Sequence, residues 1–168
     1  PESSGREPAS IGSDKSIGQP GEIIDSQHLR SQADYHFTLA EAHSLEGDAD
    51  RAIEEYKLTL IYDPDSASVR LKLATELVRK GQLVQAVDQA EMAVKLAPQN
   101  PEAHLLLGGL YSSSKLYDEA MEQYAEVLKL NPANTEAGLY IGAILSEQRK
   151  YDQSIAHFKK MAAQNKAQ

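Results

Sequence analysis

The sequence of 168 residues contains no cysteine, and only 6% of its residues are aromatic. The lack of cysteine excludes disulfides, thiolate nucleophiles and cysteine-ligated zinc sites. It leaves the compartment open, because cysteine-free chains suit the cytosol and the bacterial periplasm equally. The small aromatic share, together with many Ala and Leu residues, favours packed helices over a β-sandwich.

Long apolar runs and excess positive charge are also lacking. No run approaches the roughly 18 to 20 apolar residues that span a bilayer, so direct membrane insertion of this chain is not expected. The net charge of −8 and the pI near 5.1 argue against nucleic acid as a partner. Such binding depends on Lys and Arg side chains that neutralise phosphates.

The composition of residues 1–32 differs from that of the rest. This segment contains seven Ser, four Gly and three Pro and shows no helical or alternating period, so it buries too little surface to offset its ordering entropy. We predict a flexible N-terminal tail or tether over 1–32, with order beginning near Ser26 as the N-cap of a helix that continues through Ala33. If the tail is ordered, we expect it to insert isoleucines into a groove or a neighbouring chain, namely Ile11, Ile17, Ile23 or Ile24.

From Ala33 onward the chain repeats with a period of 34 residues, in windows 33–66, 67–100, 101–134 and 135–168. The seventh position is large and aliphatic, and the eighth and twentieth positions are small. In window order, the seventh position has Leu39, Leu73, Leu107 and Ile141, the eighth has Ala40, Ala74, Gly108 and Gly142, and the twentieth has Ala52, Ala86, Ala120 and Ser154. The twenty-fourth has Tyr56, Ala90, Tyr124 and Phe158, and the thirty-second has Pro64, Pro98, Pro132 and Lys166.

Each recurrence has a steric reason. Small residues at positions eight and twenty allow the two helices of a repeat, A and B, to approach closely, and large residues at seven and twenty-four fill the space between repeats. Proline at position thirty-two ends helix B. Gly47 and Gly81 lie at the A-to-B turn, where a left-handed cap is expected. We predict A helices near 33–46, 67–80, 101–114 and 135–148, and B helices near 49–62, 83–96, 117–130 and 151–164.

Residues 33–168 resemble the tetratricopeptide-repeat family, and the segment YDEAMEQYAEVLKLNP, residues 117–132, is similar to the second helix of that family nearly residue for residue. The sequence departs from the pattern at position four, which has His36, Arg70, His104 and Gly138, and at the missing proline of repeat four. The resemblance implies an all-α, right-handed superhelical solenoid of four repeats. It also implies a concave groove, lined by the A helices, that holds peptides, helices or whole partner proteins.

The chain is therefore expected to be a protein-interaction scaffold or adaptor and not an enzyme. Position five, with Phe37, Leu71, Leu105 and Leu139, predicts an apolar stripe that suits a peptide or an amphipathic helix with apolar anchors. An alternative is that packing between repeats partly buries these side chains and those of Leu106 and Tyr140. The predicted partner-binding residues are Phe37, Glu41, Leu71, Lys72, Thr75, Val78, Arg79, Leu105, Leu106, Gly109, Leu139, Tyr140 and Ala143. Of the Lys, Asn and Arg clamp that the family's chaperone-tail binders carry, only Lys72 and Arg79 are present, so a chaperone tail is not the expected ligand.

The charge is distributed unevenly along the chain. The repeats carry net charges of −7, +2, −3 and +2 from first to last. The acidic first repeat is interpreted as a solvating cap of the stack or as a docking patch for a basic partner.

No residues predict catalysis, a cofactor or a metal. His36 and His43 lie seven residues apart on one helical face, but no third ligand occurs at a metal-site spacing. Two other roles stay open: a self-assembling subunit that pairs through repeat four or the tail, and an accessory protein that positions a catalytic partner. The Ser/Gly/Pro-rich tether favours a bacterial periplasmic or envelope location, as in secretion and pilus complexes, over a cytoplasmic one.

Overall fold

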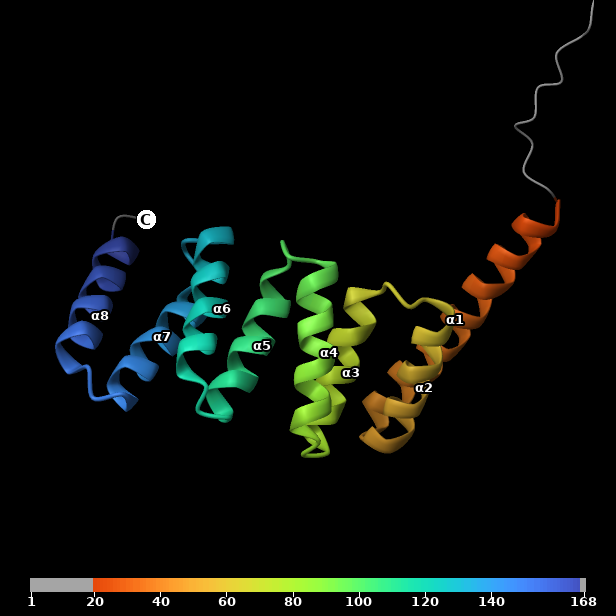
Figure 1. Ribbon diagram of the computed structural model, residues 1–168, viewed down its shortest axis with the longest axis horizontal. Helices are drawn as coiled ribbons and strands as arrows, with labels where there is room; N and C mark the ends of the chain where they lie inside the picture. Colours follow the sequence, from red (N-terminus) through yellow and green to blue (C-terminus); the bar gives the residue numbers. More distant parts are fainter. Residues whose placement is uncertain (1–19, 167–168) are drawn as a thin grey trace, which may run out of the picture.

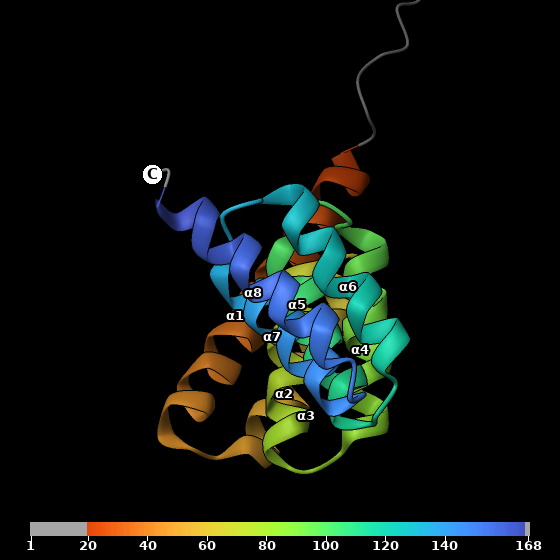
Figure 2. The ribbon, with the colours of Figure 1, turned by 90° about the vertical axis from the view of Figure 1, so that its left-hand side faces the viewer.

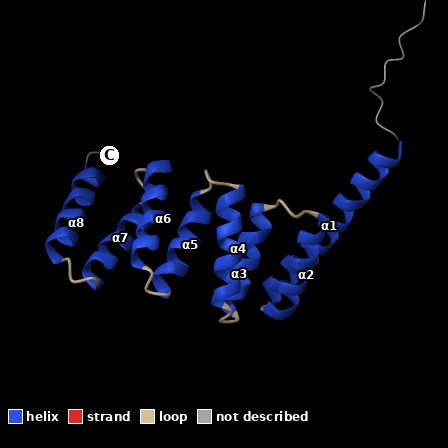
Figure 3. Ribbon diagram, viewed as in Figure 1, coloured by secondary structure: helices blue, strands red, loops and turns tan. Residues whose placement is uncertain are grey.

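The computed structural model describes residues 20–166, and these residues form eight helices and no strand (Figure 3). The A helices are α1 (Pro20–Glu46), α3 (Ala67–Arg79), α5 (Pro101–Ser113) and α7 (Thr135–Glu147). The B helices are α2 (Ala49–Tyr62), α4 (Leu83–Leu96), α6 (Tyr117–Leu130) and α8 (Tyr151–Lys166). The predicted all-α solenoid of four repeats is confirmed, and the predicted helix ends agree to within about two residues except at the start of α1.

The four antiparallel hairpins stand side by side in one row from α1–α2 to α7–α8 (Figure 1). The B helices α2, α4 and α6 each pack against the A helix that follows, so the main contacts among the described residues join neighbouring repeats. The view along the row shows the hairpins stacked behind one another and progressively rotated (Figure 2).

The first helix differs from the prediction. It begins at Pro20 and not near Ser26, so residues 20–32 are helical and do not belong to a flexible tail as predicted. Proline is favoured in the first turn of a helix, and extending an existing helix adds a hydrogen bond for each residue that is ordered. This part of α1 projects beyond α2, and its side chains from 25 to 31 are exposed (Figure 1).

The isoleucines named for the predicted tail contacts lie outside the part of the chain whose side chains are described. Ile11 and Ile17 lie outside the described residues, and Ile23 and Ile24 lie in α1 at positions whose side chains are not described.

A left-handed residue closes the A-to-B turn of every repeat, always at position fifteen. Gly47 and Gly81 have φ values of 81° and 71°, as predicted for glycine caps. Lys115 and Arg149 adopt the same conformation, with φ values of 60° and 61°. Because this region is unfavourable for residues with a Cβ atom, the turn geometry is imposed by the repeat and not by glycine alone.

Small residues produce the predicted close approach within repeats. Ala40, Ala52, Ala74 and Ala120 are completely buried. In repeat four, Ser154 at position twenty donates a 2.9 Å hydrogen bond from its Oγ to the carbonyl oxygen of Gly142 at position eight. The two helices are thus in direct contact where the sequence placed the small residues.

The polar residues at position four link three segments of the chain. The guanidinium of Arg70 donates to Oε1 of Gln89 on α4 at 2.9 Å and to the carbonyl oxygen of Pro64, in the preceding loop, at 2.7 Å. The imidazole of His104 lies 2.8 Å from both Oε1 of Gln123 and the carbonyl oxygen of Pro98. Position four therefore ties helix A both to helix B of its repeat and to the loop before it.

Repeats one and four have different contacts at position four. In repeat one, His36 Nδ1 lies 2.6 Å from Oε2 of Glu55, and the imidazole stacks on the ring of Tyr62. In repeat four, Gly138 has no side chain, and His157 of α8 instead donates from Nε2 to the Gly138 carbonyl oxygen at 2.7 Å. Metal binding would compete with the Glu55 contact of His36, and no cluster of metal ligands occurs among the described residues.

Candidate partner-binding groove

Two adjacent hollows lie between successive A helices. The first, of about 350 Å³, lies between repeats one and two and is lined by Glu41, Ser44, Leu45, Tyr56, Lys72, Thr75, Glu76 and Arg79. The second, of about 290 Å³, lies between repeats two and three and is lined by Ser68, Leu71, Lys72, Thr75, Asn100, Glu102 and Leu106. Lys72 and Thr75 line both hollows, so the two form a continuous surface on the A helices.

A hydrogen-bonded network forms the floor of the first hollow. The phenol of Tyr56 donates to Glu41, and Lys72 Nζ lies 3.0 Å from the same carboxylate. Lys72 also lies 5.8 Å from the ring centroid of Phe37, within cation–π distance. These contacts fix the Lys72 side chain at the boundary between the two hollows.

The network changes the proton affinity of its members. Burial alone raises the pKa of Glu41, but hydrogen bonds from Tyr56 and Lys72 and the positive charge of Lys72 outweigh it, so the pKa is lowered. Burial, followed by the hydrogen bond to the Glu41 carboxylate, raises the pKa of Tyr56. The network therefore holds an ionised carboxylate beside a neutral phenol over the whole physiological pH range.

A second carboxylate is buried at the back of this hollow. Glu76 accepts a 2.6 Å hydrogen bond from Oγ of Ser44 on α1, and Arg79 Nη1 lies 3.2 Å from the same carboxylate. The guanidinium of Arg79 is half exposed. A buried acid is thus partnered by one neutral donor and one cation, as buried charges require.

Six predicted partner-binding residues line the two hollows: Glu41, Leu71, Lys72, Thr75, Arg79 and Leu106. Phe37 and Leu105 are half buried and pack against core clusters, so the alternative of partial burial applies to them. Tyr140 stacks on Tyr124 with ring centroids 5.1 Å apart, and Gly109 lies beside the same tyrosine. Val78, Leu139 and Ala143 are exposed, and none of them lines either of these two hollows.

A third hollow, of about 620 Å³, was not predicted. It lies between the carboxyl end of α6, the loop 131–134 and α8, and its lining includes Leu128, Pro132, Gly138, Lys160 and Met161. The signal in the sequence was Gly138, because arginine or histidine fills the corresponding space in repeats two and three. Met161 partly replaces that side chain, since its Cε would lie 2.6 Å from a Cβ at Gly138.

The sequence of this chain matches the model of a known protein family. The family model for the tetratricopeptide repeat matches residues 71–134 and 115–168, more than half of the chain. The chain belongs to the tetratricopeptide-repeat family. No curated protein sequence gives a significant match.

Solved structures of tetratricopeptide-repeat proteins have the same fold. The crystal structure of MamA is similar with a TM-score of 0.76 and 22% identity, over 86% of each chain. MamA from Desulfovibrio magneticus RS-1, from residue 41 to its end, has a TM-score of 0.74 and 20% identity over 90% of this chain and 88% of that one. The first such domain of Spaghetti (RPAP3), solved with the HSP90 peptide SRMEEVD, has a TM-score of 0.67 and 23% identity over 71% of this chain and 94% of that one.

Family membership assigns the general role. Tetratricopeptide repeats form interaction modules, and this tetratricopeptide-repeat chain is a protein–protein interaction scaffold in that general sense. Within the part of the chain that the structure describes, no helix is both long enough and apolar enough to cross a membrane.

Proposed function

We propose that this scaffold binds a peptide or an amphipathic helix of a partner protein along the A-helix surface, with apolar side chains of the partner in the hollow beside Leu71 and Leu106. The observation that carries the proposal is the pair of hollows that share Lys72 and Thr75. Together they form an elongated depression across three repeats. Such a shape suits a segment with several anchors better than it suits one compact ligand.

The two hollows differ in polarity, so the apolar and the polar contacts of a partner would lie at different ends of the depression. Leu71 and Leu106 provide apolar walls in the second hollow, whereas the first contains Glu41, Lys72 and Arg79. Lys72 and Arg79 remain partly exposed while paired with carboxylates. They can therefore donate further hydrogen bonds to a partner's backbone or side chains, which supplies orientation beside the apolar anchors. The peptide bound in the Spaghetti structure supports peptide binding by this fold.

Selection of random peptides displayed on phage against the 168-residue chain tests the proposal. Selected peptides are measured by fluorescence anisotropy against the wild type and against Thr75→Trp, which fills both hollows from an exposed position. We expect Thr75→Trp to weaken binding at least about tenfold, or about 1.4 kcal/mol. The matched control is Gln85→Trp, on the exposed surface of α4. Peptides that bind Thr75→Trp as tightly as the wild type would refute the assignment.

A self-assembling role is the second candidate function, and a specific observation favours it. The apolar residues at positions twenty-one and twenty-four of α8 are exposed, whereas their counterparts in the other B helices are covered. The compartment, including the predicted envelope location, stays a prediction.

A further inference from the structure

The outer surface of α8 is exposed, whereas the equivalent surfaces of the other B helices are buried under the next repeat. At position twenty-four, Tyr124 of α6 is 1% exposed under α7, whereas Phe158 of α8 is 38% exposed. At position twenty-one, Ile53 of α2 is 6% exposed and Ile155 of α8 is 52% exposed. The ring of Phe158 packs on Gly142 of α7 within repeat four, and no later helix among the described residues covers the rest of this surface.

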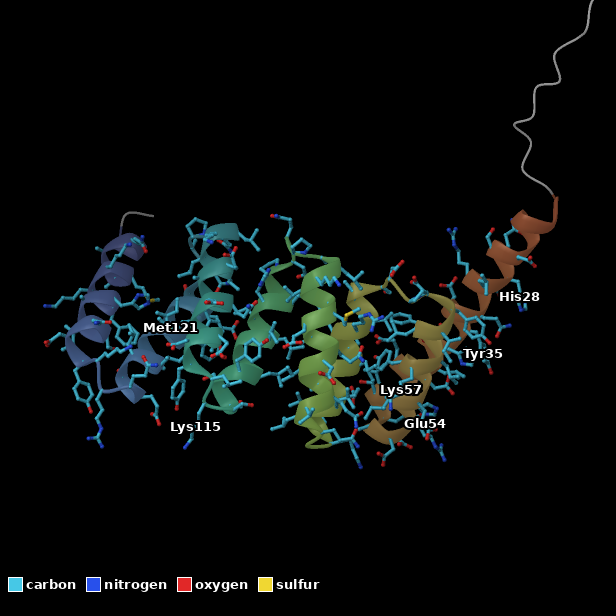
Figure 4. All side chains as sticks on the ribbon, viewed as in Figure 1. His28, Tyr35, Glu54, Lys57, Lys115 and Met121 are labelled. Atoms are coloured by element: carbon cyan, nitrogen blue, oxygen red, sulfur yellow. The ribbon has the colours of Figure 1, made fainter. Side chains whose placement is uncertain are left out.

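The outer surface of α1 is uncovered in the complementary way. At position three, Val69 of α3 is 4% exposed against the preceding B helix, whereas Tyr35 of α1 is 60% exposed. At position ten, Leu110 and Ile144 are buried, whereas Ala42 of α1 is exposed. Figure 4 labels Tyr35 on α1, at the end of the row opposite α8.

The outer surfaces of α8 and α1 correspond to the two sides of the interface between neighbouring repeats. The molecule forms that interface three times, between α2 and α3, between α4 and α5, and between α6 and α7. At the last of these interfaces, Tyr124 of α6, at position twenty-four, stacks on Tyr140 of α7. The outer surface of α8 is of the B kind and the outer surface of α1 is of the A kind, so one molecule carries both unmatched halves.

The charges of the two helices are also complementary. α1 has five acidic residues and one basic residue, whereas α8 has three basic residues and one acidic residue. Repeat one as a whole carries −7 and repeat four +2. Approach of α1 to α8 is therefore electrostatically favoured, whereas approach of two α8 helices or of two α1 helices is not.

We propose that the occupant of the α8 surface is α1 of a second copy of this chain, so that copies join head to tail and continue the row of repeats. Between repeats, as within them, a B helix and the A helix that follows it run antiparallel (Figure 1). The projecting half of α1 then passes the carboxyl end of the other copy's α8, which brings Asp25 towards the end that carries Lys159 and Lys160. The contact does not cover the hollows beside Leu71, so it is independent of the proposed peptide binding.

The geometry predicts an open assembly. A head-to-tail contact uses different surfaces on the two partners, so each added copy leaves one α1 surface and one α8 surface free. The assembly grows by single copies and does not stop at a dimer. This behaviour distinguishes it from a symmetric pairing of two α8 helices.

Sedimentation velocity of the 168-residue chain over a concentration series tests the proposal. We expect the weight-average mass to rise steadily from the 18.4 kDa of one chain, and to rise less at high salt, where the attraction between α1 and α8 is screened. Ile155→Glu blocks the α8 surface and Tyr35→Glu blocks the α1 surface. Each variant alone should stay monomeric, but an equimolar mixture should form dimers and nothing larger, because one intact surface of each kind remains.

The matched control is Ile61→Glu, an exposed isoleucine of α2 outside both surfaces, which should assemble like the wild type. Charge reversal of Lys159 and Lys160, which are exposed, should weaken assembly at least fivefold without touching the packed core. Circular dichroism confirms that each variant is folded. A wild type that stays monomeric at all concentrations, a Tyr35→Glu variant that still dimerises alone, or a mixture that stays monomeric would each overturn the proposal.

Discussion

The carboxylate of Glu76, at position ten of repeat two, lies 2.6 Å from Oγ of Ser44 in the preceding repeat. The equivalent positions in repeats three and four hold Leu110 and Ile144, both buried. The same site between repeats thus accepts either an apolar side chain or an acid, and only the acid needs Ser44 and Arg79 to satisfy it.

Replacing Glu76 by leucine is therefore expected to be neutral or to raise the free energy of unfolding by about 1–2 kcal/mol, because burial of a charge costs desolvation. Urea denaturation measures the change. Ser44→Ala keeps the acid but removes its donor, and should lower the free energy of unfolding by about 1–3 kcal/mol. If Glu76→Leu were the more destabilising of the two, the hydrogen-bonded acid would be a net source of stability.

The left-handed residues at position fifteen give a second prediction. Lys115→Gly and Arg149→Gly should each raise the free energy of unfolding by up to about 1 kcal/mol, since glycine avoids the steric cost of φ near 60°. Gly81→Lys should lower it by a similar amount. A Cβ atom at Gly81 would meet no heavy atom within 4 Å. The change in the free energy of unfolding therefore reflects the backbone conformation and not a steric clash. Thermal denaturation of the three variants measures these changes, and equal melting temperatures would contradict the argument.

Position five provides a matched pair of leucines. Leu105 is half buried and packs against the core of repeats three and four, whereas Leu139 is exposed. Leu105→Asp should lower the free energy of unfolding by about 2–3 kcal/mol, and Leu139→Asp by less than about 1 kcal/mol. Urea midpoints of the two variants measure the difference. Equal losses would mean that Leu105 contributes no more to the core than a surface side chain.

The close contact between helices A and B is tested at Ala120, which is completely buried. Ala120→Asp should cost about 3–5 kcal/mol, because it places an unpaired charge between α5 and α6. Ala125→Asp, on the exposed side of the same helix, should cost below about 1 kcal/mol. Hydrogen exchange should show repeats three and four of the Ala120 variant opening before repeat one. Uniform opening of all four repeats would contradict this local failure.

Alkaline stability depends on a buried tyrosine. Burial, and then the charges of Tyr140 and Glu136, raise the pKa of Tyr124 to about 12, above its usual value near 10. A raised pKa stabilises the folded state fully below the unfolded value and loses that effect as the pH rises through the folded value. We expect Tyr124→Phe to retain stability better than the wild type between pH 10 and about 12, by about 2–3 kcal/mol at the upper end. Urea denaturation at a series of pH values checks this, and identical pH profiles would contradict it.

The regular part of the fold could be predicted because each constraint is local. Prolines at position thirty-two and small residues at positions eight and twenty fix where helices end and where they touch, so the bounds of α2, α4 and α6 agree with the structure. The start of α1 does not follow from the sequence pattern, because the side chains from 25 to 31 are exposed and no buried positions give this part of the helix an apolar period.

Only some of the predicted groove residues line the two hollows. Periodicity identifies which residues face away from helix B, but the exposure of those residues depends on the rotation between repeats. Leu105 therefore packs against a core while Leu139, at the same position in its repeat, is exposed. The bond from Tyr56 to Glu41 joins two helices of repeat one, 15 positions apart, and the contact between Lys72 and Glu41 joins two repeats, 31 positions apart. Glu at position nine and Lys at position six each occur in one repeat only, so the 34-residue period does not predict these contacts.

The links at position four have a consequence for how motion is transmitted along the row. Arg70 ties α3, and His104 ties α5, to the loop that ends the preceding repeat, so opening of the helix or of the loop disturbs the other. Gly138 has no side chain to reach the corresponding loop, and the bond from His157 stays within repeat four. The joint between repeats three and four thus lacks one mechanical coupling that the two earlier joints possess, and bending of the row should concentrate there.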